Sequence, residues 1–258
     1  MKAMTINLLL SLSILALFVV NAVANEDFPL RAKYPSAKHI STAELATKFA
    51  NVIVVDVRST EEFDVAHINK ARHVPISKAS FERDLEGVRN KTGNQLMAFY
   101  CNGHTCAKSY KAYIKAFDAG FINIVVYDAG IFDWIMSNPE KATLMGKTPA
   151  PKDKIIPKSK LQEHMVNFGD LKGMTSDINA MAIDIRDPFQ RNIVPDIAKL
   201  RNIPMDRMIP LLRKNKFQDK KLLIIDAVGK QVRWLQYHLE ENGYTDYKFL
   251  EKGVAGIK

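Results

Sequence analysis

Short runs of apolar, β-branched residues alternate along this chain with stretches in which apolar residues recur at helical spacing. The runs at 51–58 and 96–101 are almost wholly apolar, which is typical of strands that are covered on both faces. The stretch 108–121 has an amphipathic pattern, and Gly120 near its end suits the left-handed position that closes a helix. Strands that alternate with helices in this way predict an α/β fold in which a parallel sheet is flanked by helices.

The same order of segments occurs twice. The first-half segments 40–50, 51–58, 66–75, 96–101 and 108–121 correspond in order to 156–168, 180–186, 195–204, 221–226 and 231–244. Ser41 or Thr42 is expected to cap the first helix. We therefore predict two similar domains, at 25–145 and 159–258. The segment 146–158 is rich in proline and lysine and is predicted to link them.

The N-terminus has the pattern of a secretory signal peptide. Lys2 precedes an apolar run at 6–20, and small residues follow at 22–24. We expect cleavage after residue 24 and a mature protein without a membrane span, which in a bacterium would be periplasmic. An uncleaved membrane anchor is the alternative, but the apolar run is short and contains two serines.

Charge adds one constraint. The 258 residues carry a formal net charge of +9, which favours anionic partners. The lysines are spread along the chain without a dense basic block, so no nucleic-acid partner is predicted.

Both cysteines of the chain lie in the stretch FYCNGHTCAKSY at 99–110. A disulfide between them would close a very small loop and stabilise the fold little. Cys101 directly follows a predicted buried strand, where ligands bind in parallel α/β sheets. Backbone N–H groups of the turn and the start of the next helix would lower the pKa of this thiol and favour a nucleophilic thiolate. An inert buried cysteine is the ordinary alternative.

The segment 56–75 carries a more specific pattern. Its characteristic residues are Asp56, Arg58, Glu62, Phe63, His67, Ile68 and Pro75. Together with the cysteine loop, the Ala-Gly pair at 129–130 and Trp134, they resemble the rhodanese family. Ala66 stands where that family usually has glycine. Because both halves share the pattern, the chain resembles a tandem-domain rhodanese, and two tandem rhodanese-like domains are implied.

The resemblance implies a sulfurtransferase. Cys101 would attack the outer sulfur of thiosulfate or polysulfide and become a persulfide. A thiol, cyanide or a protein thiol would then accept the sulfur, and no cofactor besides the persulfide is implied. The residues expected to bind the anionic donor are Asn102, Gly103, His104, Thr105, Cys106, Ala107 and Lys108. His104 and Lys108 could instead be ordinary solvated side chains of a loop and a helix start.

The second half lacks the nucleophile. Asp226 stands where the first half has Cys101, and a carboxylate cannot carry a sulfane sulfur. Gln190 and Asp196 replace the glutamate and histidine of the first half. We therefore expect this half to be catalytically silent and to act as a structural partner or as a wall of the active cleft.

Other interpretations of the cysteine loop remain. Phosphatases related to this fold use Cys-x5-Arg, but Ala107 occupies the arginine position and cannot clamp a phosphate. Cys106 could fill space, form a disulfide with Cys101, or join Cys101 and His104 as metal ligands, a set too small for a typical site. The alternative function is a non-enzymatic persulfide carrier or a thiol redox switch that uses Cys101 and Cys106.

Overall fold

Two parallel sheets, one in each half of the chain, form the framework of the molecule. The computed structural model describes residues 27–257, so the predicted signal peptide at 1–24 lies outside the described residues. The first sheet has the strand order β3 (Arg72–His73), β1 (Val52–Asp56), β4 (Leu96–Tyr100) and β5 (Ile124–Tyr127). The second has the order β9 (Arg201–Asn202), β8 (Ala180–Asp184), β10 (Lys221–Ile225), β11 (Tyr247–Leu250) and β7 (Met165–Val166). All neighbouring strands within these two sheets are parallel, so the predicted α/β class is confirmed.

The two sheets follow one topology. In each, the strand that ends in Asp-x-Arg lies beside the strand that ends at the loop, and the last long strand lies beyond it. The pairing of Asp56 with Tyr100 in the first sheet corresponds to that of Asp184 with Ile225 in the second. The internal repeat seen in the sequence is therefore a repeat of structure.

Nine α-helices are present among residues 27–257. In the first half they are α1 (Thr42–Thr47), α2 (Thr60–Val65), α3 (Phe81–Thr92), α4 (Lys108–Asp118) and α5 (Gly130–Ser137). In the second half they are α6 (Lys158–Glu163), α7 (Phe168–Met174), α8 (Met205–Arg213) and α9 (Val232–Glu241). Short 3-10 turns lie at Pro139–Lys141, Lys152–Lys154, Pro188–Gln190 and Val254–Gly256. Ser41, one of the two predicted caps, closes the start of α1 by accepting the N–H of Glu44.

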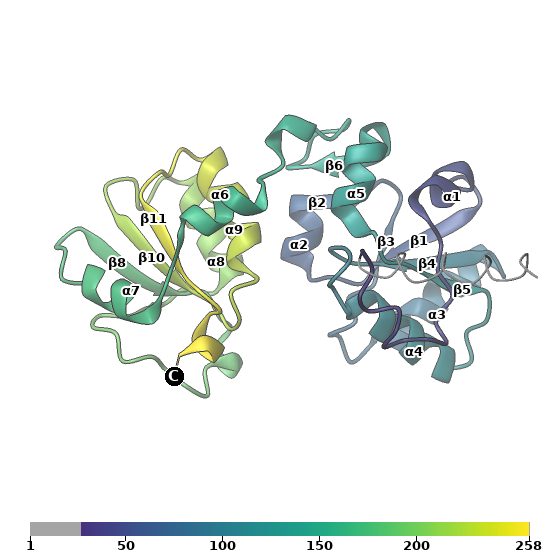
Figure 1. The fold of residues 1–258 in the computed structure, drawn as a ribbon, viewed down its shortest axis with the longest axis horizontal. Coiled ribbons are helices and arrows are strands. Elements are labelled where there is room, and N and C mark those ends of the chain that lie inside the picture. The colour runs from purple at the N-terminus through teal and green to yellow at the C-terminus, as the bar shows by residue number, and fades with distance from the viewer. Residues whose placement is uncertain (1–26, 258) are drawn as a thin grey trace, which may run out of the picture.

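The alternation of side chains along each strand divides the core into faces. In β4, Met97 and Phe99 point to the face covered by α3 and α4, whereas Ala98 and Tyr100 point to the opposite face. That opposite face belongs to a hydrophobic cluster that continues into the second half and includes Trp234. The two lobes seen in Figure 1 are therefore joined by a shared apolar core.

Aromatic and cationic side chains hold this junction between the halves. The rings of Phe132 on α5 and Trp234 on α9 stack with their centroids 5.6 Å apart. The guanidinium of Arg233 lies 4.0 Å from the centre of the Phe132 ring. In Figure 1 helix α2 faces the second lobe, and it packs against α9. These contacts bring the second half close to the residues that follow β1.

The segment 146–158, predicted as a linker, runs between the two lobes. A short antiparallel pair of β2 (Ala66–Ile68) and β6 (Ala142–Leu144) precedes it. Ala150 and Ile156 within it are buried, and the N–H of Ile156 donates to the hydroxyl of Tyr237. The connection is thus packed against the second half. Within the part of the chain that the structure describes, no helix has the length and apolarity needed to cross a membrane.

Candidate active site

The loop 101–107 joins the carboxyl end of β4 to the start of α4. It is folded tightly, because the N–H of Cys106 donates to the carbonyl oxygen of Gly103 over 2.8 Å and Gly103 has a φ of 141°. Gly130, at the start of α5, lies directly against it. A Cβ at Gly130 would come within 2.4 Å of the backbone nitrogen of Gly103, so only glycine fits there. This contact explains the Ala-Gly pair at 129–130.

Cys101 lies beneath this loop and is only 1% exposed. Its side chain shares the face of Met97 and Phe99 and packs into the apolar cluster under α4. The sulfur lies 3.1 Å from the backbone oxygen of Cys106 and 3.4 Å from the Ser109 hydroxyl oxygen. Burial raises the pKa of the Cys101 thiol well above its usual value, and the contacts with Cys106 add to the rise. The lowered pKa predicted for Cys101 from its place at the strand end is therefore wrong, because the sulfur is buried in the apolar cluster under α4.

The loop instead directs its positive groups toward Cys106. The backbone N–H groups of Asn102 and Lys108 lower the pKa of Cys106, a residue that is partly exposed. A hydrogen bond from the Cys101 thiol, these two N–H groups and the Lys108 ammonium together outweigh partial burial and lower the pKa of Cys106 to about 6. Both cysteines are free thiols. The negative charge that the sequence predicts for this loop therefore lies on Cys106.

A polar network borders the loop on the side of α2. The carboxylate of Glu62 is buried and accepts hydrogen bonds from Asn102, over 2.7 Å, and from the ammonium of Lys108. Arg58 donates to the same Asn102 side chain and pairs with Asp56. Burial alone would raise the pKa of Glu62, but Lys108 and Arg58 outweigh it and lower that pKa. Lys108 and Asn102, both predicted donor-binding residues, are thereby fixed at the loop edge.

The other predicted residues of the loop are arranged differently. His104 stacks on Phe28, and its ring nitrogens contact the Asp133 carboxylate at 2.9 Å and the Asp27 carbonyl at 2.6 Å. Burial lowers the pKa of His104, but Asp133 and Asp27 raise it overall. Thr105 is exposed and Ala107 is half-buried before α4. The His104 ring is therefore held by α5 and by the N-terminal segment. Among residues 27–257, no group of three or more histidine, cysteine, aspartate or glutamate side chains is placed to hold a metal ion.

The first half matches a known protein family. Residues 41–137 match the family model for the rhodanese-like domain, and this range contains both β1 with its Asp-x-Arg pair and the cysteine loop. Residues 41–137 form a rhodanese-like domain. No curated protein sequence matches the chain.

The chain also has similarity to solved structures at low identity and low TM-score. The BH2092 protein from Bacillus halodurans is 22% identical, with 52% of this chain and 94% of that chain covered and a TM-score of 0.38. A thiosulfate sulfurtransferase from Pseudomonas aeruginosa is 15% identical over 85% of this chain and 42% of its own, with a TM-score of 0.36. SseA from Escherichia coli, described among 3-mercaptopyruvate sulfotransferases, is 14% identical over 83% of this chain and 98% of its own, with a TM-score of 0.34.

The second half contains a loop at the position that the cysteine loop has in the rhodanese-like domain. Asp226 follows β10, is fully buried, and accepts backbone N–H groups from Gly229, Gln231 and Val232 over 2.5, 2.6 and 3.2 Å. Gly253 approaches this loop as Gly130 approaches the first. The second loop is thus wrapped around its own carboxylate.

Two residues near the rhodanese-like loop were not predicted as site residues. Glu62 and Arg58 were recognised only as part of the family pattern, although Asn102 connects both to the loop. Arg58 also lies 5.4 Å from the ring centre of Trp234, so the second half reaches this network. Their position just after β1, which pairs with β4, is a signal that the sequence does contain.

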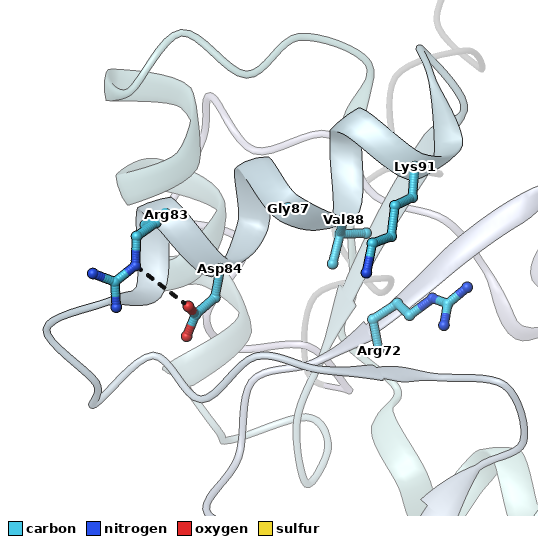
Figure 2. A pocket seen from close by; sticks show the side chains of 6 residues that line it. All are labelled: Arg72, Arg83, Asp84, Gly87, Val88 and Lys91. Carbon is cyan, nitrogen blue, oxygen red and sulfur yellow. Dashed lines mark ion pairs between the residues drawn. The ribbon is translucent and has the colours of Figure 1, made fainter.

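A separate cavity of about 330 Å³ lies between α3 and β3. It is lined by Arg72, Arg83, Asp84, Gly87, Val88 and Lys91, and Figure 2 shows Arg83 close to Asp84 with Lys91 and Arg72 on the other side. None of these residues belongs to the cysteine loop of the rhodanese-like domain. The cavity is therefore distinct from the candidate active site.

Proposed function

We propose that this protein is a sulfurtransferase that carries a sulfane sulfur on Cys101. The donor is thiosulfate or a polysulfide, and the acceptor is a small thiol, cyanide or a protein thiol. The supporting observation is the position of Cys101 at the carboxyl end of an inner strand of the rhodanese-like domain, beneath a tightly folded loop. We further propose that the protein is exported to the periplasm, as its N-terminus indicates, and that the persulfide replaces any cofactor.

Activation of Cys101 needs a base, because burial keeps this thiol protonated. The Cys106 thiolate lies near the Cys101 thiol, which donates to the Cys106 backbone oxygen, and the two groups shift each other's pKa. Two such coupled groups titrate as a pair that shares one proton. Transfer of that proton from Cys101 to Cys106 places the negative charge on the buried sulfur, which then becomes the nucleophile.

The electrostatics of the loop favour an anionic donor and an anionic persulfide. The N-terminus of α4 and the ammonium of Lys108 border the loop. The second half supports this argument, since its equivalent loop holds the Asp226 carboxylate with three backbone N–H groups. These N–H groups lower the pKa of Asp226, although burial outweighs them and raises it overall. Backbone N–H groups at the strand end therefore offset part of the cost of burying a negative charge there.

The proposed reaction has two displacements. The Cys101 thiolate attacks the outer sulfur of thiosulfate, the sulfur–sulfur bond of the donor breaks, and sulfite leaves with the electron pair. An acceptor such as cyanide then attacks the outer sulfur of the persulfide, so that thiocyanate forms and the Cys101 thiolate returns. No net oxidation or reduction of the protein occurs in this cycle.

Intact mass spectrometry tests the proposal. Reduced protein is incubated separately with thiosulfate, polysulfide and mercaptopyruvate, and then with cyanide. We expect the mass of one added sulfur atom, which cyanide removes, with thiosulfate or polysulfide. Cys101→Ser should lose this adduct and at least about 1000-fold in turnover, as expected for loss of a nucleophile. Full activity in Cys101→Ser, or no adduct with any donor, would contradict the proposal, provided that circular dichroism shows the variant to be folded.

The 1% exposure of Cys101 favours one second candidate, a persulfide carrier that releases sulfur only to a protein partner. The same preparation distinguishes the two functions. An enzyme turns over steadily with cyanide or a small thiol, whereas a carrier holds its persulfide against these acceptors and transfers it rapidly to a protein thiol.

A further inference from the structure

The two thiols of the loop are in contact but have different environments. Cys101 is almost fully buried, whereas Cys106 is partly exposed. The Cys101 sulfur contacts the Cys106 backbone oxygen at 3.1 Å, and Cys101 is the largest cause of the lowered pKa of Cys106. The two thiols therefore influence each other's ionisation, which a residue that only filled space would not do.

The surroundings of Cys106 are those of an attacking thiolate. The N–H groups of Asn102 and Lys108 and the Lys108 ammonium stabilise its negative charge, and they keep its pKa near 6. At neutral pH this sulfur is mostly ionised. Thiol–disulfide exchange is fastest when the attacking thiol has a pKa near the ambient pH, so Cys106 is well matched to such a reaction.

We propose that Cys106 is a resolving thiol, which attacks the inner sulfur of the Cys101 persulfide, forms a Cys101–Cys106 disulfide and releases hydrosulfide. This proposal rests on the proposed function, because it needs the persulfide. It adds a second fate for the donated sulfur. The protein would pass sulfur to an acceptor when one is bound and would otherwise reduce it to hydrosulfide.

The step is balanced in atoms and electrons. The new bond joins the sulfur atoms of Cys106 and Cys101, and the bond between Cys101 and the outer sulfur breaks. The outer sulfur leaves with that electron pair and the persulfide proton, as hydrosulfide. The two cysteines lose two electrons, and the sulfane sulfur gains them. A thiol reductant, such as a dithiol, is then needed to restore the two free thiols.

The turn of the loop brings residue 106 back to the Cys101 sulfur. Gly103 turns the chain back so that Cys106, five residues after Cys101, lies over the end of β4. Because Cys106 is partly exposed, a reductant could approach its sulfur in the oxidised form. The disulfide would close a short loop, so it would contribute little to stability and would serve the reaction instead.

Stoichiometric incubation of the full chain tests the proposal. Reduced protein is freed of external thiols without oxygen and is given one equivalent of thiosulfate and no acceptor. We expect wild type to release one equivalent of hydrosulfide and to lose the mass of two hydrogens, with peptide mapping that locates a Cys101–Cys106 disulfide. Dithiothreitol should restore the original mass. Cys106→Ser, incubated until intact mass shows the sulfur adduct, should release at least about tenfold less hydrosulfide per persulfide formed, because it lacks the resolving thiolate.

Three outcomes would overturn the proposal. Wild type could retain the sulfur on Cys101 beside a free Cys106, or Cys106→Ser could release hydrosulfide as fast as wild type. Either result leaves the proposed sulfurtransferase intact. If wild type takes up no sulfur from thiosulfate or polysulfide, both proposals fail together. Cys106→Ala provides a second variant in case the serine hydroxyl alters the loop.

Discussion

The loops after β4 and β10 have the same place in the fold but contain different charged groups. In the second half the Asp226 carboxylate accepts three backbone N–H groups and fills its loop. In the first half Cys101 is buried under its loop, and the N–H groups face Cys106 instead. The N–H of Ile131, which follows Gly130, donates to the carbonyl oxygen of Cys101 over 3.1 Å. In the same way the N–H of Val254, which follows Gly253, donates to the carbonyl oxygen of Asp226 over 2.9 Å. The fold thus provides a loop suited to an anion, and the residue at the strand end decides whether that loop is occupied by the protein itself.

The largest stability difference between the loops should come from removing the group at the strand end. Asp226→Ala leaves three N–H groups, one buried and two partly buried, without their acceptor, and we expect a loss on the order of 3 kcal/mol in the free energy of unfolding. Cys101→Ala removes only a buried sulfur and should cost about 1–2 kcal/mol. Urea unfolding followed by tryptophan fluorescence measures both.

Asp226→Asn is the matched control, since it keeps one oxygen acceptor and should lose about half as much as alanine. The two tryptophans of the chain, Trp134 and Trp234, lie one in each half and are both buried. Equal losses for Asp226→Ala and Cys101→Ala would show that the Asp226 hydrogen bonds do not hold the second loop.

The common framework of the two loops was predictable from the sequence. The apolar runs predicted β1, β4, β8 and β10, because strands covered on both faces need few polar residues. Gly120 lies at the end of α4 with a φ of 85°, as its place after an amphipathic stretch indicated, and Gly243 has the same place after α9 with a φ of 75°.

The charge within the cysteine loop was not predicted. The alternation along β4 already places Cys101 on the face of Met97 and Phe99, so its burial could have been found. The direction of the N–H groups toward Cys106 depends on the path of the loop and on Gly130, which is distant in sequence. The contact of Trp234 with Arg58 likewise depends on how the two halves pack. Long-range packing of this kind is not encoded in local periodicity.

The second difference between the loops is that the first contains a group, the Cys106 thiol, whose pKa of about 6 lies near neutral pH. Only a thiolate is alkylated rapidly, so the rate of Cys106 alkylation by iodoacetamide should be constant above a pH of about 6 and should fall about tenfold for each pH unit below it. The hydrogen bond from Cys101 is the largest cause of the lowered pKa of Cys106. Cys101→Ala should therefore shift the whole profile to higher pH.

Mass spectrometry after timed alkylation gives both profiles, with peptide mapping to assign the modified cysteine. A wild-type midpoint near the usual cysteine value of about 8.5 would contradict the assignment of the negative charge to Cys106. Preferential alkylation of Cys101 would contradict it as well, because that sulfur is buried and protonated in the structure.

The smallest expected effect concerns the first residue of the helix that follows each loop. This residue is Lys108 in the first half and Val232 in the second. The Lys108 side chain is 42% exposed and is paired with Glu62, so its attraction for an anionic donor is partly screened. Lys108→Met should raise the KM for thiosulfate about threefold and change kcat less, since a partly exposed charge contributes less than about 1 kcal/mol. Lys111→Met, which removes an exposed lysine from the same helix, is the matched control. Initial rates at low and high salt test this expectation. The difference in KM between Lys108→Met and wild type should shrink at high salt, because salt screens the charge of Lys108. Equal KM values for the two variants at low salt would mean that Lys108 serves only to neutralise Glu62.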